Sequence, residues 1–227
     1  MTYAIVPAGG LGARMGSRRP KQYLRLGRVP ILVATLRALA RAREVAGIVV
    51  AVPAARVEPT RRLLARLRVP KILEVVAGGA DRQESVWRAL QRVPAAAGCV
   101  VVHDAVRPFI DAALVARVLA AAKGGAATCG VPVGETVKRV TAGAIEATIP
   151  RQGLWLTQTP QAFTRALLWE AHDKARRDGF VGTDDAMLVE RLGLTVAMVP
   201  GLPRNLKITT PEDLETARAW AAPRRRA

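Results

Sequence analysis

Several residue types are scarce in this sequence, and each scarcity excludes a class of protein. The 227 residues include only two cysteines and two histidines, too few for a zinc cluster built from these ligands. Cys99 and Cys129 lie in apolar segments, so we expect reduced core cysteines of a cytoplasmic protein rather than a disulfide. No apolar run is long enough for a transmembrane helix, and no basic region precedes the first apolar residues. We therefore expect neither a membrane partner nor an export signal.

Aromatic and acidic residues are also few. Aromatic side chains make up 4% of the chain, which leaves little material for the stacking platforms that bind single-stranded nucleic acid. The 35 lysines and arginines outnumber the 18 acidic residues and give a net charge of +17, which favours anionic ligands. Because the arginines are spread along amphipathic segments, a solvated basic surface explains them better than a nucleic-acid site does, and we expect no nucleic-acid partner.

Short apolar runs alternate with segments of helical periodicity. Strands are predicted at residues 3–6, 48–52, 72–76, 99–102, 126–131 and 195–199, and helices at 30–43, 59–67, 81–91, 111–122, 165–177, 184–192 and from 210 onward. Pro30 is expected at the first helical position, and Asp81 and Asp111 as helix caps. The pattern predicts an α/β fold, a doubly wound and mostly parallel sheet in one domain over residues 1–227. Ligands of such sheets bind beyond the carboxyl ends of the strands.

Residues 131–155 break this alternation. Threonine and valine alternate with charged residues on both sides of Ala142–Gly143, which is typical of a β-hairpin. We expect residues 132–153 to form a hairpin that protrudes from the domain. The pattern alone leaves two interpretations open, a dimerisation arm and an ordinary surface hairpin.

The first apolar run leads directly into PAGGLGARMGSRRPKQYL, residues 7–24. Glycines let backbone N–H groups approach phosphate oxygens. The dinucleotide-binding fingerprint fails because its third glycine falls at Met15, and the Walker A pattern fails because Gly16-Ser17 has no lysine. The loop instead offers a glycine cradle followed by two cations, Arg14 and Lys21, that could clamp a triphosphate. A flexible basic loop is the alternative.

Acidic residues at two further places in the sequence are candidates for metal binding. Asp104 comes at the carboxyl end of a predicted strand, where a lone carboxylate suits Mg²⁺ bound to triphosphate oxygens; a turn cap is the alternative. Arg107 is placed three residues later for an anionic substrate. Asp184 and Asp185 resemble a paired-carboxylate metal site, but a helix cap formed by Thr183 and Asp184 is the better interpretation.

Five segments together resemble one enzyme family. They are residues 7–24, GGADRQESV at 78–86, VHDAVRPF at 102–109, RQGLWLTQTPQAF at 151–163 and NLKITTPEDL at 205–214. In this order they are similar to the 2-C-methyl-D-erythritol 4-phosphate cytidylyltransferases of the non-mevalonate isoprenoid pathway. The resemblance implies a Rossmann-like nucleotidyltransferase that joins CTP to methylerythritol phosphate and releases pyrophosphate. It further implies a Mg²⁺-dependent, cytoplasmic homodimer that forms through the hairpin arm.

The resemblance also implies roles for single residues. The catalytic cations would be Arg14, Lys21 and Lys207. The CTP site would consist of Pro7, Ala8, Gly9, Gly10, Gly12, Gly79, Ser85, Asp104 and Ala105, with the metal on Asp104. The second substrate would contact Arg107, Thr136, Arg151 and Thr159, partly across the dimer, and we add Thr183 for a hydroxyl contact. Some members carry an acidic residue where this chain has Ala80, and Arg82 either substitutes for it or only caps charge.

The implied nucleophile is a phosphate monoester oxygen. Its second pKa is about 6, so no general base is required, which suits a sequence without an evident Ser-His-Asp or Cys-His arrangement. One alternative is a sibling cytidylyltransferase that acts on another polyol phosphate, such as ribitol 5-phosphate. From another class, a cationic module that binds nucleotides or nucleic acids would keep the loop without the chemistry. Since the last matched helix lies close to Ala227, we expect no fused cyclase domain.

Overall fold

The protein is built around one seven-stranded sheet. Its computed structural model describes residues 1–10, 15 and 20–222. The strand order is β11 (Ala197–Pro200), β7 (Ala126–Pro132), β10 (Trp155–Thr164), β6 (Cys99–Val102), β1 (Thr2–Pro7), β4 (Val45–Val52) and β5 (Ile72–Ala77). Neighbouring strands are parallel except for β10, which runs antiparallel to both β6 and β7. The prediction of a mostly parallel α/β sheet is confirmed, although β10 was not among the predicted strands.

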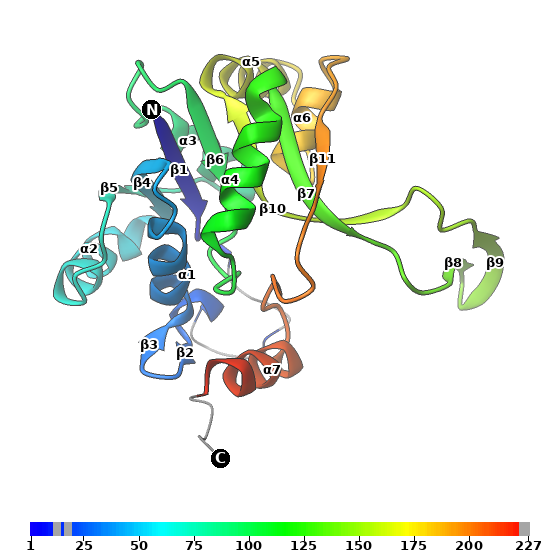
Figure 1. Cartoon of the computed structure of the whole chain (residues 1–227), viewed down its shortest axis with the longest axis horizontal. Helices are drawn as coiled ribbons and strands as arrows, with labels where there is room; N and C mark the ends of the chain where they lie inside the picture. Colours follow the sequence, from blue (N-terminus) through cyan, green and yellow to red (C-terminus); the bar gives the residue numbers. More distant parts are fainter. Residues whose placement is uncertain (11–14, 16–19, 223–227) are drawn as a thin grey trace.

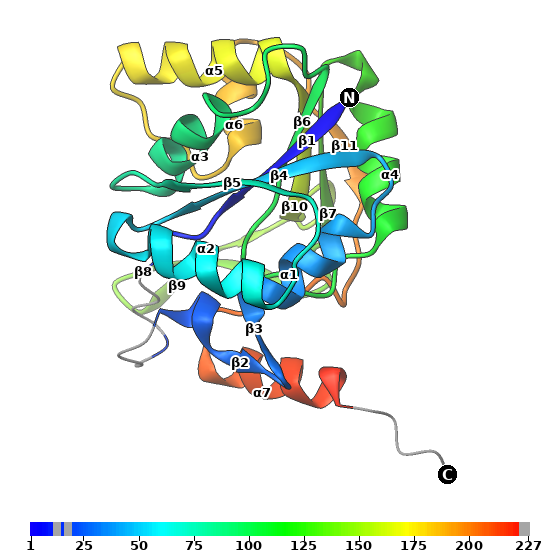
Figure 2. The ribbon, with the colours of Figure 1, turned by 90° about the vertical axis from the view of Figure 1, so that its left-hand side faces the viewer.

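Helices cover both faces of this sheet (Figure 2). One face packs against α1 (Ile31–Ala40), α2 (Val57–Arg66) and α4 (Ala112–Ala121), and the other against α3 (Arg82–Leu90), α5 (Arg165–Arg177) and α6 (Asp185–Glu190). Side chains alternate between the faces along β1: Ala4 and Val6 belong to the first core and Ile5 to the second. Burial on both faces explains why these strands are apolar runs in the sequence.

Most helices begin where capping residues predicted. The side chain of Asp81 accepts a hydrogen bond from the N–H of Glu84 at the start of α3, and Asp111 caps α4 in the same way. The placement of Pro30 at the first helical position was wrong by one residue. Helix α1 begins at Ile31, because Pro30 pairs with Arg25 in a short antiparallel ribbon and keeps an extended backbone with ψ of 152°.

A smaller layer lies below the carboxyl edge of the sheet (Figure 1). It contains the ribbon of β2 (Arg25–Leu26) and β3 (Val29–Pro30), and α7 (Pro211–Ala221), whose start is a capping box of Thr210 and Asp213. A third apolar cluster joins this layer to the sheet through Ile208, whose N–H donates to the carbonyl of Val106. The short 3₁₀ turns are η2 (Lys21–Tyr23), η3 (Ala54–Arg56) and η4 (Ala122–Gly124). The hydrogen bond from Ile208 to Val106 anchors the segment that carries Lys207 beside the loop after β6.

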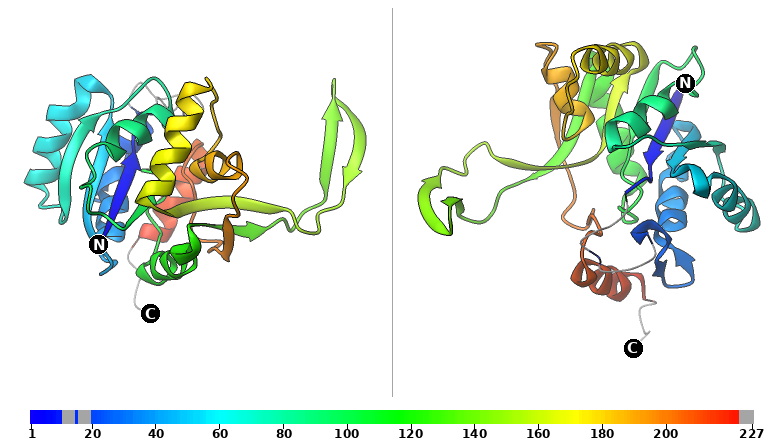
Figure 3. Two further views of the ribbon diagram at one scale, coloured as in Figure 1. Left: turned by 90° about the horizontal axis from the view of Figure 1, so that it is seen from above. Right: turned by 180° about the vertical axis from the view of Figure 1, so that it is seen from behind.

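A two-stranded arm extends away from the body, formed by β8 (Val137–Thr141) and β9 (Ala144–Ile149) (Figures 1 and 3). Ala142 and Gly143 both have positive φ, 51° and 82°, which suits a two-residue hairpin turn. The predicted protruding hairpin is confirmed. Its Val140 and Ile145 side chains are 55% and 66% exposed. Within the described residues, no helix has the length and apolarity needed to cross a membrane.

Candidate active site

A pocket of about 520 Å³ opens beyond the carboxyl ends of β1, β5 and β6. This is the edge at which parallel α/β sheets bind ligands. Its lining comprises Pro7, Ala8, Gly9, Gly10, Lys21, Gln22, Gly79, Ala80, Asp81, Arg82, Ser85, Asp104, Ala105, Val106, Lys207 and Thr209. The structure therefore brings together every described residue of the predicted CTP site, and two of the predicted catalytic cations. The other members of those sets, Gly12 and Arg14, lie outside the described residues.

The turn after β5 can approach the pocket closely because it carries no side chains at its tightest point. A Cβ on Gly79 would lie 1.9 Å from Cγ of Glu84, and one on Gly78 would lie 2.7 Å from the Ser85 hydroxyl. That hydroxyl donates to the carbonyl of Asp81 at 2.8 Å and accepts from the N–H of Gly79 at 3.1 Å. Since a hydroxyl oxygen has two lone pairs, one acceptor position of Ser85 is left for a ligand.

Gln22 positions the lysine of the first loop, a role that was not predicted from the sequence. Its Nε2 donates to the carbonyl of Ala8 at 2.6 Å, and the side chain is 1% exposed. This bond ties the η2 turn to the glycine segment across fourteen residues. Lys21, the neighbour of Gln22, is thereby held among the residues that line the pocket. A glutamine beside a lysine carries no distinctive sequence signal, so this link requires the structure.

Asp104 is the electrostatic centre of the pocket. Its Oδ2 lies 3.1 Å from Lys207 Nζ and 3.1 Å from Arg107 Nε, and its Oδ1 lies 3.6 Å from Arg82 Nε. Burial raises the pKa of this carboxyl, but the charges of Lys207, Arg82 and Arg107 outweigh it and hold the pKa well below its usual range. Asp104 is therefore a fixed negative charge at any physiological pH, surrounded by cations.

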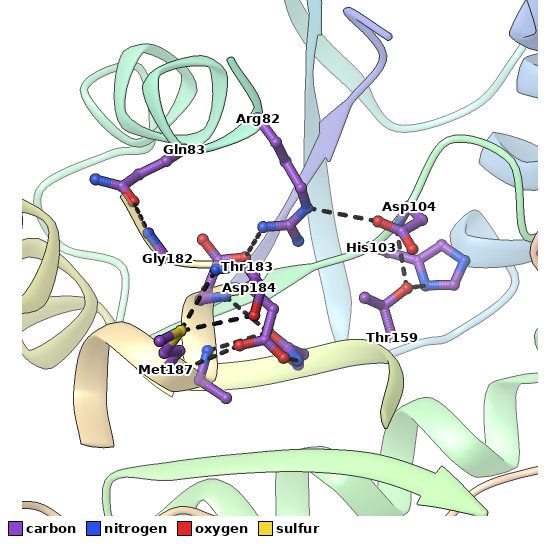
Figure 4. Close-up of polar contacts among 12 residues, drawn as sticks. Arg82, Gln83, His103, Asp104, Thr159, Gly182, Thr183, Asp184 and Met187 are labelled. Carbon is purple, nitrogen blue, oxygen red and sulfur yellow. Dashed lines mark hydrogen bonds and ion pairs between the residues drawn. The ribbon is translucent and has the colours of Figure 1, made fainter. Parts of the chain in front are cut away.

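A buried polar chain supports Asp104 from below (Figure 4). Thr159 Oγ1 accepts from the N–H of Asp104 at 3.0 Å and lies 3.0 Å from Nδ1 of His103, whose Nε2 lies 3.1 Å from the carbonyl of Arg107. A carbonyl only accepts, so Nε2 carries the proton and Nδ1 accepts from Thr159. Burial lowers the pKa of His103 to about 4, so the ring is neutral. Thr159 is not among the lining residues, and its predicted substrate contact stays a prediction.

Arg107 holds two loops together beneath the pocket. The residue is 7% exposed, and its Nη1 donates to the carbonyl of Asn205 at 2.8 Å while its Nε binds Asp104. Asn205 in turn donates to the carbonyl of Thr159 at 2.7 Å. The guanidinium thus links the Asp104 loop to the segment of Lys207. A direct contact between Arg107 and substrate, expected from the sequence, stays a prediction.

The other predicted substrate contacts lie away from the pocket lining. Thr136 and Arg151 are exposed residues at the base of the arm, where the Arg151 guanidinium donates to the carbonyl of Gly134. Thr183 is exposed, and its hydroxyl lies 3.6 Å from the sulfur of Met187. Within the described part of one chain, these three residues are not among those that line the pocket.

The adjacent carboxylates at the start of α6 have different surroundings. Asp184 is the predicted helix cap and accepts from the N–H of Met187 at 2.9 Å. Asp185 is 1% exposed and lies 2.7 Å from Arg82 Nη1 and 3.0 Å from His172 Nε2. Burial raises the pKa of Asp185, but Arg82 and His172 outweigh it and lower the pKa below its usual value. This buried cluster is not predictable from local sequence, because its members come from three different helices, α3, α5 and α6.

A divalent cation would find the ionised carboxylate of Asp104 in this pocket. No group of three or more His, Cys, Asp or Glu side chains in the described parts of the chain could hold a metal by itself. Asp104 lines the pocket and is ionised. Mg²⁺ is commonly bound through one or two carboxylates together with substrate phosphates. The donor set therefore fits a metal that arrives with a triphosphate.

Comparison with known proteins adds to this geometry. The sequence profile of the 2-C-methyl-D-erythritol 4-phosphate cytidylyltransferase family matches residues 2–222. A protein of that name from Acidobacterium capsulatum is 47% identical over 95% of both chains, and one from Geobacter metallireducens is 45% identical over 96% of both. The crystal structure of the Thermus thermophilus protein of that name superimposes with a TM-score of 0.80 at 39% identity. The match covers 96% of this chain and 97% of the Thermus chain.

Proposed function

Since the chain belongs to the 2-C-methyl-D-erythritol 4-phosphate cytidylyltransferase family, we propose that the pocket beside Asp104 is its active site. The reaction is cytidylyl transfer from CTP to 2-C-methyl-D-erythritol 4-phosphate. A phosphate oxygen of the acceptor forms a bond to the α-phosphorus of CTP, and the bond from that phosphorus to the bridging oxygen breaks, so that pyrophosphate leaves. One observation carries the proposal: the segments after β1, β5 and β6 bring the described residues of the predicted CTP site to one pocket, and Lys21 of the η2 turn and Lys207 after β11 line the same pocket.

The cations of the pocket solve the main difficulty of this reaction, which is that two anions must meet. Lys21, in the η2 turn, and Lys207, between β11 and α7, both line the pocket. Together with Arg14 of the first loop, they would offset the repulsion between the phosphates and stabilise the charge of the leaving pyrophosphate. The acceptor phosphate is already largely ionised at neutral pH, since its second pKa is about 6. The neutral, buried His103 is therefore not needed as a base.

Mg²⁺ belongs to the proposal as the divalent cofactor. Asp104 would hold it, and when bound it would neutralise part of the triphosphate charge. The backbone of Gly9, Gly10 and Gly79 would approach the nucleotide, with Ser85 offering its remaining acceptor position. Lys207 Nζ forms an ion pair with Asp104 Oδ2 at 3.1 Å. We expect this side chain to turn toward the phosphates when the nucleotide binds.

A homodimer formed through the arm is the second part of the proposal. Val140 and Ile145 expose apolar surface near the tip of the arm. An isolated two-stranded hairpin is only marginally stable in water, so contact with a partner would stabilise the arm. A second copy would cover this surface and would bring Thr136 and Arg151, together with Thr183, Thr159 and Arg107, around the acceptor phosphate. Ile145→Lys should shift the protein to monomers in sedimentation velocity, whereas Leu73→Lys, at a 49% exposed position on the edge strand β5, should not. A dimer that survives Ile145→Lys would refute the role of the arm.

A cytoplasmic location completes the proposal. CTP is a cytoplasmic nucleotide, and both Cys99 and Cys129 are free thiols, as expected in a reducing compartment. Cell fractionation with an antibody to the protein should find it with the cytosolic markers.

A pyrophosphate-release assay tests the reaction itself. With Mg²⁺ and CTP, methylerythritol phosphate should support rapid release, and ribitol 5-phosphate should support little. UTP, ATP or GTP in place of CTP should lower kcat/KM by about tenfold or more, because lost base contacts are worth a few kcal/mol. Equal rates with ribitol 5-phosphate would assign the chain to the sibling reaction. No release with either acceptor would refute the assignment.

A further inference from the structure

A line of ionic and polar side chains runs from the pocket into the interior on the face of the sheet covered by α3, α5 and α6. It begins at Asp104, continues through Arg82 of α3 to Asp185 of α6, and ends at His172 of α5. Figure 4 shows Arg82 lying between the loop of Asp104 and the start of α6. Asp185 and His172 line no part of the pocket. They are 1% and 0% exposed, so neither can touch a bound nucleotide without a large rearrangement.

Asp185 is fixed from two sides. His172 Nε2 lies 3.0 Å from its Oδ1 and, facing a carboxylate, acts as the donor. Gln161 of β10 accepts from the backbone N–H of Asp185 at 3.1 Å and of Ala186 at 3.2 Å. The start of α6 is thus fastened to the middle of the sheet. The second carboxylate oxygen of Asp185 points at Arg82.

Arg82 is shared unequally by two carboxylates. Its Nη1 lies 2.7 Å from Asp185 Oδ2, whereas its Nε lies 3.6 Å from Asp104 Oδ1. Asp104 Oδ2 already has Lys207 and Arg107, each at 3.1 Å, so Oδ1 is its less occupied oxygen. If the charge of Asp185 were removed, Asp104 would be the nearest anion left to Arg82. The guanidinium would then close on Oδ1 and compete with any cation that this oxygen binds.

We propose that Asp185 is a positioning residue that holds the Arg82 guanidinium back from Asp104 and so keeps Asp104 Oδ1 available to the Mg²⁺–CTP complex. The inference rests on the proposed function, because it assumes that this complex binds beside Asp104. His172 and Gln161 serve the same purpose one contact further out. The functional consequence of Asp185 passes entirely through Arg82, which makes the proposal testable by a double-mutant cycle.

The test measures Mg²⁺–CTP binding to the full chain by isothermal titration calorimetry, which needs no turnover. Asp185→Asn keeps the size of the side chain and an acceptor for His172 but removes the charge. It should weaken binding about tenfold, the effect expected when charged neighbours are coupled. In the Arg82→Gln background the same substitution should change binding less than about twofold. CTP without Mg²⁺ should show a smaller loss, and Asp173→Asn, which removes a surface carboxylate paired with Arg177, should change nothing.

Each outcome decides the proposal. An equal loss in the Arg82 and Arg82→Gln backgrounds would overturn it, and so would unaltered binding by Asp185→Asn. If circular dichroism shows that Asp185→Asn does not fold, His172→Phe replaces it. The phenyl ring keeps the stacking against Trp87 but removes the donor to Asp185. It should weaken binding about threefold with Arg82 present and not in the Arg82→Gln background. Failure of the wild-type protein to bind Mg²⁺–CTP would instead refute the proposed function.

Discussion

Replacing Lys207 by alanine separates catalysis from stability, because the chain contains a matched control. Lys207 Nζ lies 3.1 Å from Asp104 Oδ2, and its side chain is 43% exposed. Lys174 Nζ lies 3.0 Å from Asp178 Oδ2, and its side chain is also 43% exposed. The two lysines therefore match in exposure and in the distance to their carboxylate, but only Lys207 lines the pocket.

The two substitutions should cost similar stability and very different activity. A half-exposed ammonium contributes about 1 kcal/mol or less to folding, and Asp104 keeps Arg107 and Arg82 as partners when Lys207 is removed. A group that stabilises transition-state charge is worth about a hundredfold to a thousandfold in kcat, or about 3–4 kcal/mol. Lys207→Ala should therefore lower kcat about a hundredfold, whereas Lys174→Ala should leave it unchanged.

The assay is steady-state pyrophosphate release at saturating CTP, methylerythritol phosphate and Mg²⁺, beside urea unfolding of each variant. A kcat of Lys207→Ala within about threefold of wild type would refute a direct role in the reaction. An equal loss in Lys174→Ala would show that the assay reports a general effect of lost positive charge. The expected result is a similar, small change in urea unfolding in both variants, with about a hundredfold loss of turnover only in Lys207→Ala.

Further expectations concern the loops and the pH dependence. Lys21→Ala and Arg14→Ala should fold normally and lose most turnover, and wild-type rates in either variant would contradict their assignment as catalytic cations. Gly79→Ala should lower the free energy of unfolding by about 1–3 kcal/mol, since its Cβ would lie 1.9 Å from a neighbouring side chain. The control Gly124→Ala, where nothing lies within 4 Å, should be close to neutral in the same urea titration. Because the pKa of His103 is lowered to about 4 and the unfolded value is about 6.5, the unfolded chain binds an extra proton between these pH values. The free energy of unfolding should fall as pH drops through this window, and His103→Gln should flatten that fall; an unaltered slope would contradict it.

The fold was predictable where local signals were strong. Parallel strands such as β1 and β4 are buried on both faces and appear as apolar runs, and the caps Asp81 and Asp111 announce their helices. Strand β10 was not predicted because its sequence contradicts its position. It lies centrally between β6 and β7, yet it carries buried glutamines and Pro160, and its pairing with β7 shifts register between Gln158 and Ala162.

The site was predictable where residues follow strand ends. The glycine segment after β1, the turn after β5 and Asp104 after β6 meet because parallel strands end at the same edge. The support behind them was not predictable. Gln161, His172 and Asp185 come from β10, α5 and α6, which are far apart in the sequence, and only tertiary packing places them together. Local sequence patterns contain no trace of such contacts.

A crystal structure of the protein with CTP and Mg²⁺ tests the central claim most directly. It should show the triphosphate between the glycine segment of residues 7–10, Lys21 and Lys207, the cytidine beside Gly79 and Ser85, and the metal on Asp104. CTP bound elsewhere on the chain would contradict the claim. So would a structure in which the triphosphate contacts neither lysine and the metal does not contact Asp104.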